Sequence, residues 1–240
     1  MEDSVVFGRN AVAEALKSGR PANALYIADD AKSLSEIIAL AKVQGVVLKN
    51  TKREKLAQMC GATQHQGVVL SVAVQAYASL DDLFALAEQK HELPFFVICD
   101  EIEDPHNLGA IIRTAECVGA HGVIVPKRRS APLSQTVAKA SAGAVSHLPV
   151  ARVPNLVAAI EELKARGLWV YGADILGEPY HTQKLEGPIA LVIGSEGRGL
   201  GRLVKERCDG LLSLPMHGKI NSLNASVAAG VLLYEIIKWR

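Results

Sequence analysis

The sequence predicts an α/β protein whose larger part is built on a mostly parallel sheet. Apolar runs of strand length alternate along the chain with segments of helical period, which is the pattern of α/β folds. The strands expected at 95–100 (FFVICD) and 189–194 (IALVIG) are apolar almost throughout. Strands have this composition when helices cover both faces of the sheet, which favours parallel pairing. Ligands of parallel sheets bind beyond the carboxyl ends of the strands.

Residues 1–75 predict a compact α/β unit. Gly19 ends its first helix, and Ser33 and Glu36 predict a capping box at the start of its second. The elements expected are helices at 10–19, 33–45 and 52–61 and strands at 24–28, 46–49 and 67–74. Residues 76–92 are expected to form a linker and a leading helix, with the domain boundary near 76–80.

Residues 93–240 predict a second, larger domain. Its strands are expected at 95–100, 122–125, 147–151, 168–174, 189–194 and 210–215, and its helices at 108–118, 133–140, 155–166 and 200–206 and at the end of the chain. Three loops follow the carboxyl ends of strands, at 101–107, 194–199 and 215–222. We expect these loops to meet at one edge of the sheet and to form the ligand site.

Bulk charge does not point to a polyanionic partner. The 26 Lys and Arg residues against 25 Asp and Glu residues give a net charge of +1, so any nucleic-acid surface must be a local patch. Two basic clusters have this form, one at 127–129 (KRR) and one made of Lys49, Lys52, Arg53 and Lys55. Each is also what an ordinary solvated surface contains, and the sequence leaves both readings open.

The remaining composition predicts a cytoplasmic protein without a metal. The four cysteines, Cys60, Cys99, Cys117 and Cys208, are far apart and form no Cys-x-x-Cys pair, so we expect reduced, buried thiols. His106 and His217 have no metal-ligand spacing. The acidic start of the chain does not resemble a signal peptide, and the longest apolar run, 225–233, is too short to span a bilayer.

The glycine-rich segment 194–201 (GSEGRGLG) follows a strand and precedes a helix, as a dinucleotide-binding loop does. Its G-x-G-x-G spacing is wrong for that role, and Asp209 is too close to take a ribose, which argues against a nicotinamide enzyme. A tight turn would account for one or two of the glycines but not for four in eight residues. We therefore expect them to let the backbone approach a flat ligand such as adenine.

Polar residues at two helix starts are candidate site residues. Asn107 stands where a helix N-cap is expected, and Arg113 follows six residues later among apolar residues. The planar guanidinium of Arg113 suits phosphate or carboxylate, although a lone arginine is more often salt-bridged on its helix. Before the last helix, Ser222, Asn224 and Ser226 either cap the helix or face a ligand.

Three segments together resemble the motifs of the SpoU (TrmH-like) branch of the SPOUT RNA methyltransferases. They are DPHNLGAIIRTAECVGAHGVIVPKRR (104–129), ALVIGSEGRGLG (190–201) and LPMHGKINSLNASVAAGVLLYE (214–235), in the family's order. Through VFGRNAVAEAL (6–16) and GATQHQGVVL (61–70), the first domain is similar to that family's L30e-like RNA substrate-binding domain. The whole chain is most similar to the subgroup that methylates a guanosine ribose of 23S rRNA.

The resemblance implies a fold, a cofactor and a set of site residues. It implies a trefoil knot in the C-terminal SPOUT domain, a homodimer, and S-adenosylmethionine held in the knot. By the family match, the cofactor residues are Gly194, Leu214 and Leu223, through their backbone, with Ile193, Met216 and Asn224 near them. The positions around the catalytic centre are Asn107, Arg113, Glu196, Ser222 and Asn224.

The implied reaction is in-line transfer of a methyl group from a sulfonium to a ribose 2′-hydroxyl, without a metal or a covalent enzyme intermediate. A guanidinium is normally never deprotonated. We therefore expect Arg113 to stabilise the forming alkoxide, while the proton passes to an RNA phosphate, water or Glu196. Without proton transfer, Glu196 would be a positioning group.

Two further readings concern assembly and alternative functions. The apolar face of the last helix, including Leu232, Leu233, Ile236 and Ile237, exceeds what one small domain readily covers, which indicates a dimer, and core packing alone is the alternative explanation. The alternatives to a ribosomal RNA enzyme are a tRNA ribose methyltransferase and a noncatalytic RNA-binding or ribosome-assembly protein with the same fold.

Overall fold

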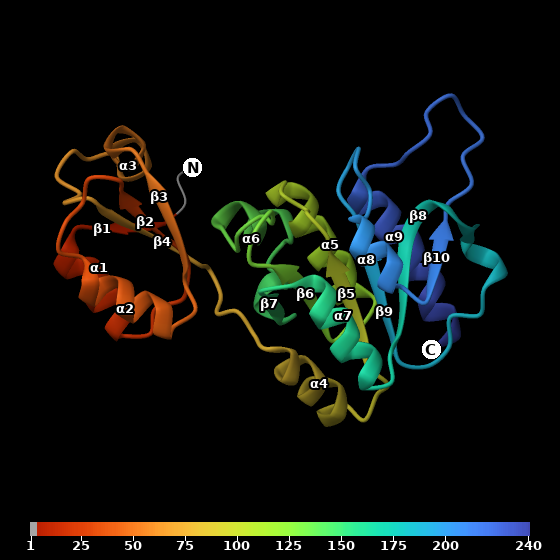
Figure 1. Cartoon of the computed structure of the whole chain (residues 1–240). Helices are drawn as coiled ribbons and strands as arrows, with labels where there is room; N and C mark the ends of the chain where they lie inside the picture. Colours follow the sequence, from red (N-terminus) through yellow and green to blue (C-terminus); the bar gives the residue numbers. More distant parts are fainter. Residues whose placement is uncertain (1–3) are drawn as a thin grey trace. The chain divides into compact units, whose positions relative to one another are not determined.

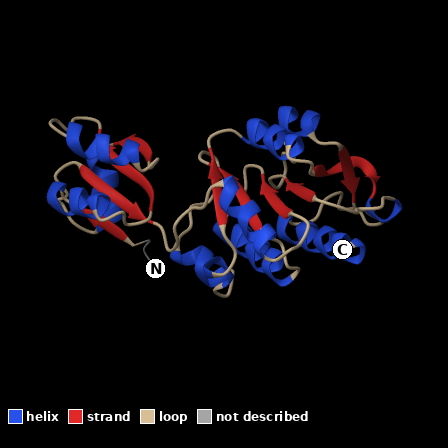
Figure 2. Ribbon diagram, turned by 90° about the horizontal axis from the view of Figure 1, so that it is seen from below, coloured by secondary structure: helices blue, strands red, loops and turns tan. Residues whose placement is uncertain are grey.

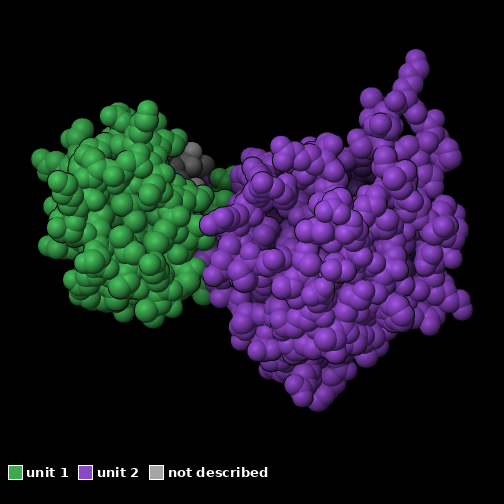
Figure 3. Space-filling view, viewed as in Figure 1, with its two compact units in different colours: residues 1–76, 132–136 green, residues 77–131, 137–240 purple. Residues whose placement is uncertain are grey.

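The computed structural model describes residues 4–240, which form two compact units (Figure 3). The first unit runs to Ala76 and also takes in Pro132–Thr136, and the second comprises Tyr77–Ala131 and Val137–Arg240. The acidic residues Glu2 and Asp3, on which the argument against a signal peptide rests, lie outside the described residues.

The first unit is a sheet with helices on both faces (Figure 1). Within the described residues the sheet has four strands in the order β1-β4-β2-β3, and only β2 and β3 are parallel. The elements are β1 (Val5–Phe7), α1 (Arg9–Lys17), β2 (Ala22–Ala28), α2 (Ser35–Val43), β3 (Val47–Thr51), α3 (Arg53–Cys60) and β4 (Val68–Val72).

Two separate apolar clusters hold the first unit together. On one face, α1 and α2 pack on the sheet through Leu16, Ile37 and Leu70. On the other face, α3 packs alone through Leu56, which contacts Ala28 and Val69. This second face is therefore covered by a single short helix.

The predicted capping box of α2 is wrong. The helix begins at Ser35, after Leu34, and no side chain caps it. Ser33 lies one residue further out, in the left-handed conformation with φ 57°. A Ser-x-x-Glu pattern caps a helix only when the serine occupies the last non-helical position.

The second unit contains a fully parallel sheet. Over the described residues its six strands lie in the order β10-β8-β9-β5-β6-β7, and every neighbouring pair is parallel. The strands are β5 (Phe95–Cys99), β6 (Gly122–Pro126), β7 (Val150–Val153), β8 (Trp169–Pro179), β9 (Ile189–Ile193) and β10 (Gly210–Ser213). The prediction of a mostly parallel sheet is confirmed.

Helices cover both faces of this sheet (Figure 2). They are α4 (Leu80–Gln89), α5 (Pro105–Cys117), α6 (Gln135–Ala140), α7 (Leu156–Ala165), α8 (Arg202–Arg207) and α9 (Ala225–Ile236), with short 3-10 turns at Ala144–Ser146, Tyr180–Thr182 and Ile237–Trp239. One apolar cluster joins α4, α7 and α8 to strand residues such as Phe96 and Ile98. On the opposite face, α5 and α9 contact each other, and α9 contacts β9.

The strand order identifies where a ligand can bind. From β5 the chain passes to β6 and β7 on one side, whereas β9 is followed by β10 on the other side. Strands β5 and β9 are neighbours, so the loops after them leave the same edge in opposite directions. A crevice forms at such a switch point in α/β sheets.

Two expectations about exposure need correction. Cys99 is buried and its pKa is raised to about 12 by burial, but Cys117 is exposed, and Cys60 and Cys208 are half-buried. Cys117 lies at the end of α5 on a solvent-facing stripe with Arg113 and Glu116, because residues three and four apart share a helix face.

The sequence also predicts an uncovered apolar face on the last helix, and the structure differs in which residues are exposed. Leu232, Leu233 and Ile236 of α9 are fully buried in the core of the unit, so they are not an uncovered face. The large apolar residues that α9 does expose are Val227, Val231 and Tyr234. No helix in residues 4–240 has the length and apolar character needed to cross a membrane.

His121 is a fully buried imidazole at the amino end of the parallel sheet. Its Nδ1 accepts a hydrogen bond of 3.1 Å from the Phe95 N–H, and its Nε2 lies 3.0 Å from Glu92 Oε2. Burial lowers the pKa of His121, although the Glu92 carboxylate opposes the shift. The folded protein therefore favours the neutral ring.

We predict that His121 makes the protein less stable below neutral pH. Because its pKa is lower in the folded state, the unfolded chain binds the proton first, and stability falls as pH drops below the ordinary value of 6.5. His121→Asn keeps an acceptor for the Phe95 N–H but cannot titrate, so its unfolding free energy should fall less steeply between pH 7 and pH 5. Urea unfolding across this range measures the difference.

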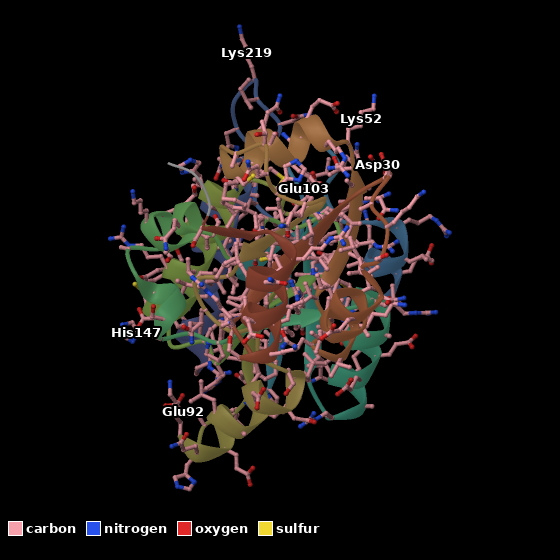
Figure 4. The ribbon with its side chains drawn as sticks, turned by 90° about the vertical axis from the view of Figure 1, so that its left-hand side faces the viewer. Asp30, Lys52, Glu92, Glu103, His147 and Lys219 are labelled. Carbon is pink, nitrogen blue, oxygen red and sulfur yellow. The ribbon has the colours of Figure 1, made fainter. Side chains whose placement is uncertain are left out.

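The control is His147→Gln, since His147 is exposed and stands out from the ribbon in Figure 4. This variant should retain the wild-type pH dependence. Equal slopes for wild type and His121→Asn would show that His121 does not titrate in this range.

Candidate functional site

Three loops meet at the carboxyl edge of the parallel sheet. We call 100–104, between β5 and α5, the first loop, 194–201, between β9 and α8, the glycine loop, and 214–224, between β10 and α9, the last loop. The last loop stands away from the second unit (Figure 1), with Lys219 at its tip (Figure 4).

Asn107 is not the N-cap of α5. Asp104 takes that position, and its carboxylate accepts a hydrogen bond of 2.9 Å from the His106 N–H, with Pro105 as the first helical residue. Proline is suited to this position because its nitrogen has no hydrogen to leave unpaired. Asn107 therefore lies inside the first turn, where its amide is available for contacts with other loops.

Asn107, Glu196 and Asn224 form a hydrogen-bonded cluster. The Asn107 Nδ2 donates to Glu196 Oε1 at 2.9 Å, and the Asn224 Nδ2 donates to Asn107 Oδ1 at 2.9 Å and also to Glu196 Oε1. The Ala225 N–H also points to Glu196 Oε1, at 3.4 Å. The network therefore joins three segments that follow three different strands: α5 after β5, the glycine loop after β9 and the last loop after β10.

Asn224 also caps the last helix. Its Oδ1 accepts hydrogen bonds from the N–H groups of Ser226 at 3.0 Å and Val227 at 3.2 Å, and from the Ser226 hydroxyl at 2.6 Å. One side chain therefore starts α9 and orients Glu196. The sequence allowed the polar residues here either to cap α9 or to face a ligand. Asn224 caps the helix and also belongs to the loop network, Ser226 supports the cap, and Ser222 lines a cavity.

The glycine loop folds back on itself. Ser195 and Gly199 exchange two backbone hydrogen bonds, of 3.1 and 2.9 Å, around Gly197, which has φ 83°. A Cβ on Gly194 would overlap the backbone of Gly199, and Gly199 itself has φ 65°. The loop's own backbone thus accounts for three of the four glycines, more than the one or two expected of a tight turn.

Asp100 binds the C-terminal end of the glycine loop. Its Oδ2 accepts a hydrogen bond of 2.7 Å from the Gly201 N–H, and its own N–H donates to the Ile193 carbonyl at 2.8 Å. Burial raises the pKa of the Asp100 carboxyl, and the bond from Gly201 opposes the shift. Asp100 is not among the site residues predicted from the sequence, although a carboxylate at the carboxyl end of an apolar parallel strand can indicate a site residue.

Two cavities share a wall that contains Glu196. The larger, of about 420 Å³, is lined by Ile193, Gly194, Leu214, Met216, Ser222 and Leu223 among others. The smaller, of about 270 Å³, is lined by the first loop and Asn107. Ser195, Glu196 and Arg198 line both. Ser195 and Arg198 were missed from the sequence, because no pattern separates them from ordinary turn residues.

Arg113 is the one predicted site residue that the structure keeps apart from this region, within residues 4–240. Arg113 follows Asn107 by six residues, which places it about 9 Å further along α5 and about 120° away around the helix axis. Arg113 is exposed and lines neither cavity. The role of Arg113 at the reaction centre therefore stays a prediction.

Other charged candidates have local roles. Arg129 of the 127–129 cluster donates to Glu101 Oε1 at 2.6 Å, and this contact raises the pKa of Arg129. Arg198 lies 3.7 Å from the other oxygen of Glu101. Across the described part of the chain, no group of three or more His, Cys, Asp or Glu side chains is placed to hold a metal ion.

The fold and the site define a two-unit α/β protein with a loop-built ligand site at the switch point of a parallel sheet. Residues 94–234 match the SpoU rRNA Methylase family, and residues 5–78 match the RNA 2'-O ribose methyltransferase substrate-binding family. The chain belongs to the SpoU methylase family, which is a family of RNA methyltransferases.

Known proteins resemble the chain over its whole length. The Bacillus subtilis protein YacO, assigned to the TrmH family of tRNA/rRNA methyltransferases, is 55% identical, covering 98% of this chain and 95% of its own. The AdoMet complexes of the Streptomyces viridochromogenes SpoU methyltransferase AviRb and of a Sinorhizobium meliloti rRNA methyltransferase are 27% and 26% identical. Both have a TM-score of 0.61 and cover 98% of this chain, and 90% and 86% of their own.

A tRNA-modifying relative matches less of the chain. The TrmH/SpoU tRNA modifying enzyme of A. aeolicus is 27% identical, with a TM-score of 0.58. The match covers 67% of this chain and 83% of that enzyme.

We predict that Gly194→Ala lowers the unfolding free energy by about 1–3 kcal/mol, because overpacking forces the backbone apart. The added Cβ would meet the backbone of Gly199 and Leu200 rather than a side chain that can move. Gly218→Ala in the last loop is the matched control, since a Cβ there has no heavy atom within 4 Å. Thermal unfolding of both variants measures the effect, and equal losses would contradict the close approach.

Proposed function

We propose that the protein is an S-adenosylmethionine-dependent RNA 2'-O-ribose methyltransferase that acts on a guanosine of 23S rRNA. The observation that carries this proposal is the position of Glu196 in the wall between two cavities. A methyl donor and an acceptor nucleoside need adjoining sites of this kind, because the transfer requires the two reacting atoms in line and in contact.

The larger cavity has the properties that S-adenosylmethionine requires. Its volume of about 420 Å³ is that of a small-molecule site. Apolar side chains of Ile193, Leu212 and Leu214 line it for an adenine ring, and Ser195 and Asn221 offer polar groups. Glu196 adds a negative charge for a cationic sulfonium. The residues expected from the family match, Gly194, Met216 and Leu223, belong to the same lining.

Chemistry at this site rests on alignment and charge. When bound, S-adenosylmethionine supplies an activated methyl group. Glu196 Oε1 is occupied by the N–H donors of Asn107, Asn224 and Ala225, so Glu196 acts as an organiser of the two cavities. Asn107 and Ser222 line the smaller and the larger cavity, where they orient the ribose and the cofactor. The hydroxyl proton then passes to an RNA phosphate or to water.

Arg113 takes part through a homodimer in this proposal. The exposed stripe Val227, Val231 and Tyr234 on α9 is apolar, and Val231 and Tyr234 line a hollow of about 540 Å³ with Tyr180. Apolar stripes of this kind mark contact surfaces. Because α5 packs beside α9, a second copy docked here would bring Arg113 of one protomer toward the cavities of its partner. The guanidinium would then stabilise the developing alkoxide.

The proposal has three further parts. The connection through the last loop forms a trefoil knot, the first unit selects the RNA while the second carries the chemistry, and the protein works in the cytoplasm, where ribosomal RNA lies. Substrate-binding and methylase regions in one chain support the division of roles.

The comparisons favour ribosomal RNA over transfer RNA. The rRNA methyltransferase of Sinorhizobium meliloti matches 98% of the chain, whereas the tRNA modifying enzyme of A. aeolicus matches 67%. Similarity that extends over both units therefore goes with the ribosomal enzyme. A tRNA ribose methyltransferase remains the second candidate, because YacO belongs to a tRNA/rRNA family.

The first test is methyl transfer to defined RNA. Wild-type protein, S-adenosylmethionine labelled in its methyl group, and either a 23S rRNA transcript or total tRNA are incubated together, and the product is mapped by nuclease digestion and mass spectrometry. We expect a single labelled guanosine, methylated on its 2′-oxygen, in the 23S transcript. Label in tRNA alone, or on a base, would refute the proposed substrate or reaction. Glu196→Ala is the inactive control.

The second test concerns the partner's arginine. Arg113→Lys should lower kcat by about 100-fold at saturating RNA, because lysine lacks the planar fork that stabilises the transition state. Mixing Arg113→Lys with Glu196→Ala before refolding should restore about a quarter of the wild-type activity, since half of randomly formed dimers are mixed and have one intact site. If the mixture stays inactive, each chain uses its own Arg113.

A further inference from the structure

One face of the sheet in the first unit carries a row of side chains that crosses all the strands described there. Phe7 pairs with Val69, Val69 pairs with Tyr26, and Tyr26 pairs with Lys49. Directly paired residues point to the same face of a sheet. We call Phe7, Val69, Tyr26 and Lys49 the aromatic row. It spans three strand spacings, or about 14 Å.

The row is only partly covered. Helix α3 packs on this face over Val69, and Tyr26 packs against the edge of the same cluster. Phe7 remains 37% exposed at one end of the row. At the other end, the Lys49 ammonium lies 5.4 Å from the centre of the Tyr26 ring. The face therefore presents a flat ring at one end and a cation over a ring at the other.

Three lysines on this side have no acidic partner among residues 4–240. Lys49, Lys52 and Lys55 are all exposed, and none is in a salt bridge there. Figure 4 shows Lys52 pointing away from the ribbon near Asp30. Asp30 is already neutralised by Arg53, with a distance of 2.9 Å between Nε and Oδ2. Glu54 is the one acidic residue in 47–55, against four basic ones.

The opposite face of the same sheet is arranged differently. Lys17 on α1 lies 3.1 Å from Glu36 and 3.9 Å from Glu14. Two helices cover that face, and most of its apolar strand residues are buried, with Val6 and Leu48 partly buried. Among residues 4–76, the aromatic residues are Phe7 and Tyr26, and both lie on the α3 side, so a ring next to free positive charge is found on that side.

We propose that the α3 side of the first unit binds a single-stranded segment of RNA, with a base stacked on Phe7 and phosphates held by Lys49, Lys52 and Lys55. This inference rests on the proposed function only in taking RNA as the substrate. A lysine surface next to exposed rings is how proteins hold single strands, because bases stack on the rings while cations follow the backbone.

A double helix fits this surface less well. Its bases are stacked on each other and cannot reach Phe7, and duplex RNA is recognised through its minor groove and phosphates. The lysines alone would bind a duplex and a single strand by charge. Phe7 therefore distinguishes the two, since it contributes only when a base is free to stack.

The test measures binding of a fluorescein-labelled 12-nucleotide oligouridine to the full-length protein by anisotropy at several salt concentrations. Each lysine replaced by Gln should reduce the slope of log K against log salt by about 0.7, which is the value for one phosphate contact of a single strand. Phe7→Leu should weaken binding about tenfold without changing that slope, whereas Phe7→Tyr should retain wild-type affinity.

The matched control is Lys42→Gln, because Lys42 is an exposed lysine on α2 at the other face of the sheet. It should leave both affinity and slope unchanged. Equal effects of Lys42→Gln and Lys49→Gln, or loss of affinity in Phe7→Tyr as in Phe7→Leu, would overturn the proposed surface. Tighter binding of the same strand within a duplex would also overturn it.

Failure of the proposed RNA-binding surface can be distinguished from failure of the proposed function. In the methyl-transfer assay, the triple variant of Lys49, Lys52 and Lys55 to Gln should raise KM for RNA and leave S-adenosylmethionine binding unchanged by calorimetry. An active wild type whose KM is insensitive to this variant contradicts the surface alone. A wild type that binds oligouridine as described but methylates no RNA contradicts the function alone.

Discussion

The geometry of the site depends on the Glu196 carboxylate, which joins loops that are distant in the sequence. Its Oε1 accepts hydrogen bonds from Asn107 and Asn224, 89 and 28 residues away. Hydrogen bonds to an ionised group are among the stronger ones, and a network that loses one member leaves the others unpaired. Asp100 acts similarly at the other end of the glycine loop. Two carboxylates thus hold the loops that the parallel sheet brings together.

The parallel sheet and the location of the site could be predicted because both follow from strand composition. Strands that are apolar at nearly every position are buried on both faces, and the carboxyl ends of parallel strands share one edge. Gly194, Glu196 and Ser222, which lie in the loops after such strands, were therefore expected near one another, whereas Asn224 was placed with them by the family resemblance. Their hydrogen-bond partners could not be predicted, since these depend on which oxygen faces which loop.

The errors concern the residue at which a helix starts and the side of a helix that is buried. Asp104 rather than Asn107 caps α5, because Pro105 favours the first helical position and so fixes the helix start. Ser33 stands one residue too early to cap α2. On α9, Leu232 and Leu233 face the core while Val231 and Tyr234 face solvent, although all four are apolar. Apolar residues around a whole helix conceal which side is buried.

The arrangement of charge explains how one chain can combine cofactor binding with RNA binding. The larger cavity is lined mainly by apolar side chains and backbone. Its charged lining residues are Asp174 and Glu196 against Arg198 and Lys205, so it has no excess of positive charge to attract phosphates. The first loop adds Glu101, Glu103 and Asp104 beside the smaller cavity. Long-range attraction for RNA must therefore come from cations elsewhere on the surface. Lys49, Lys52 and Lys55 of the first unit, which are exposed and have no acidic partner among residues 4–240, supply such charge.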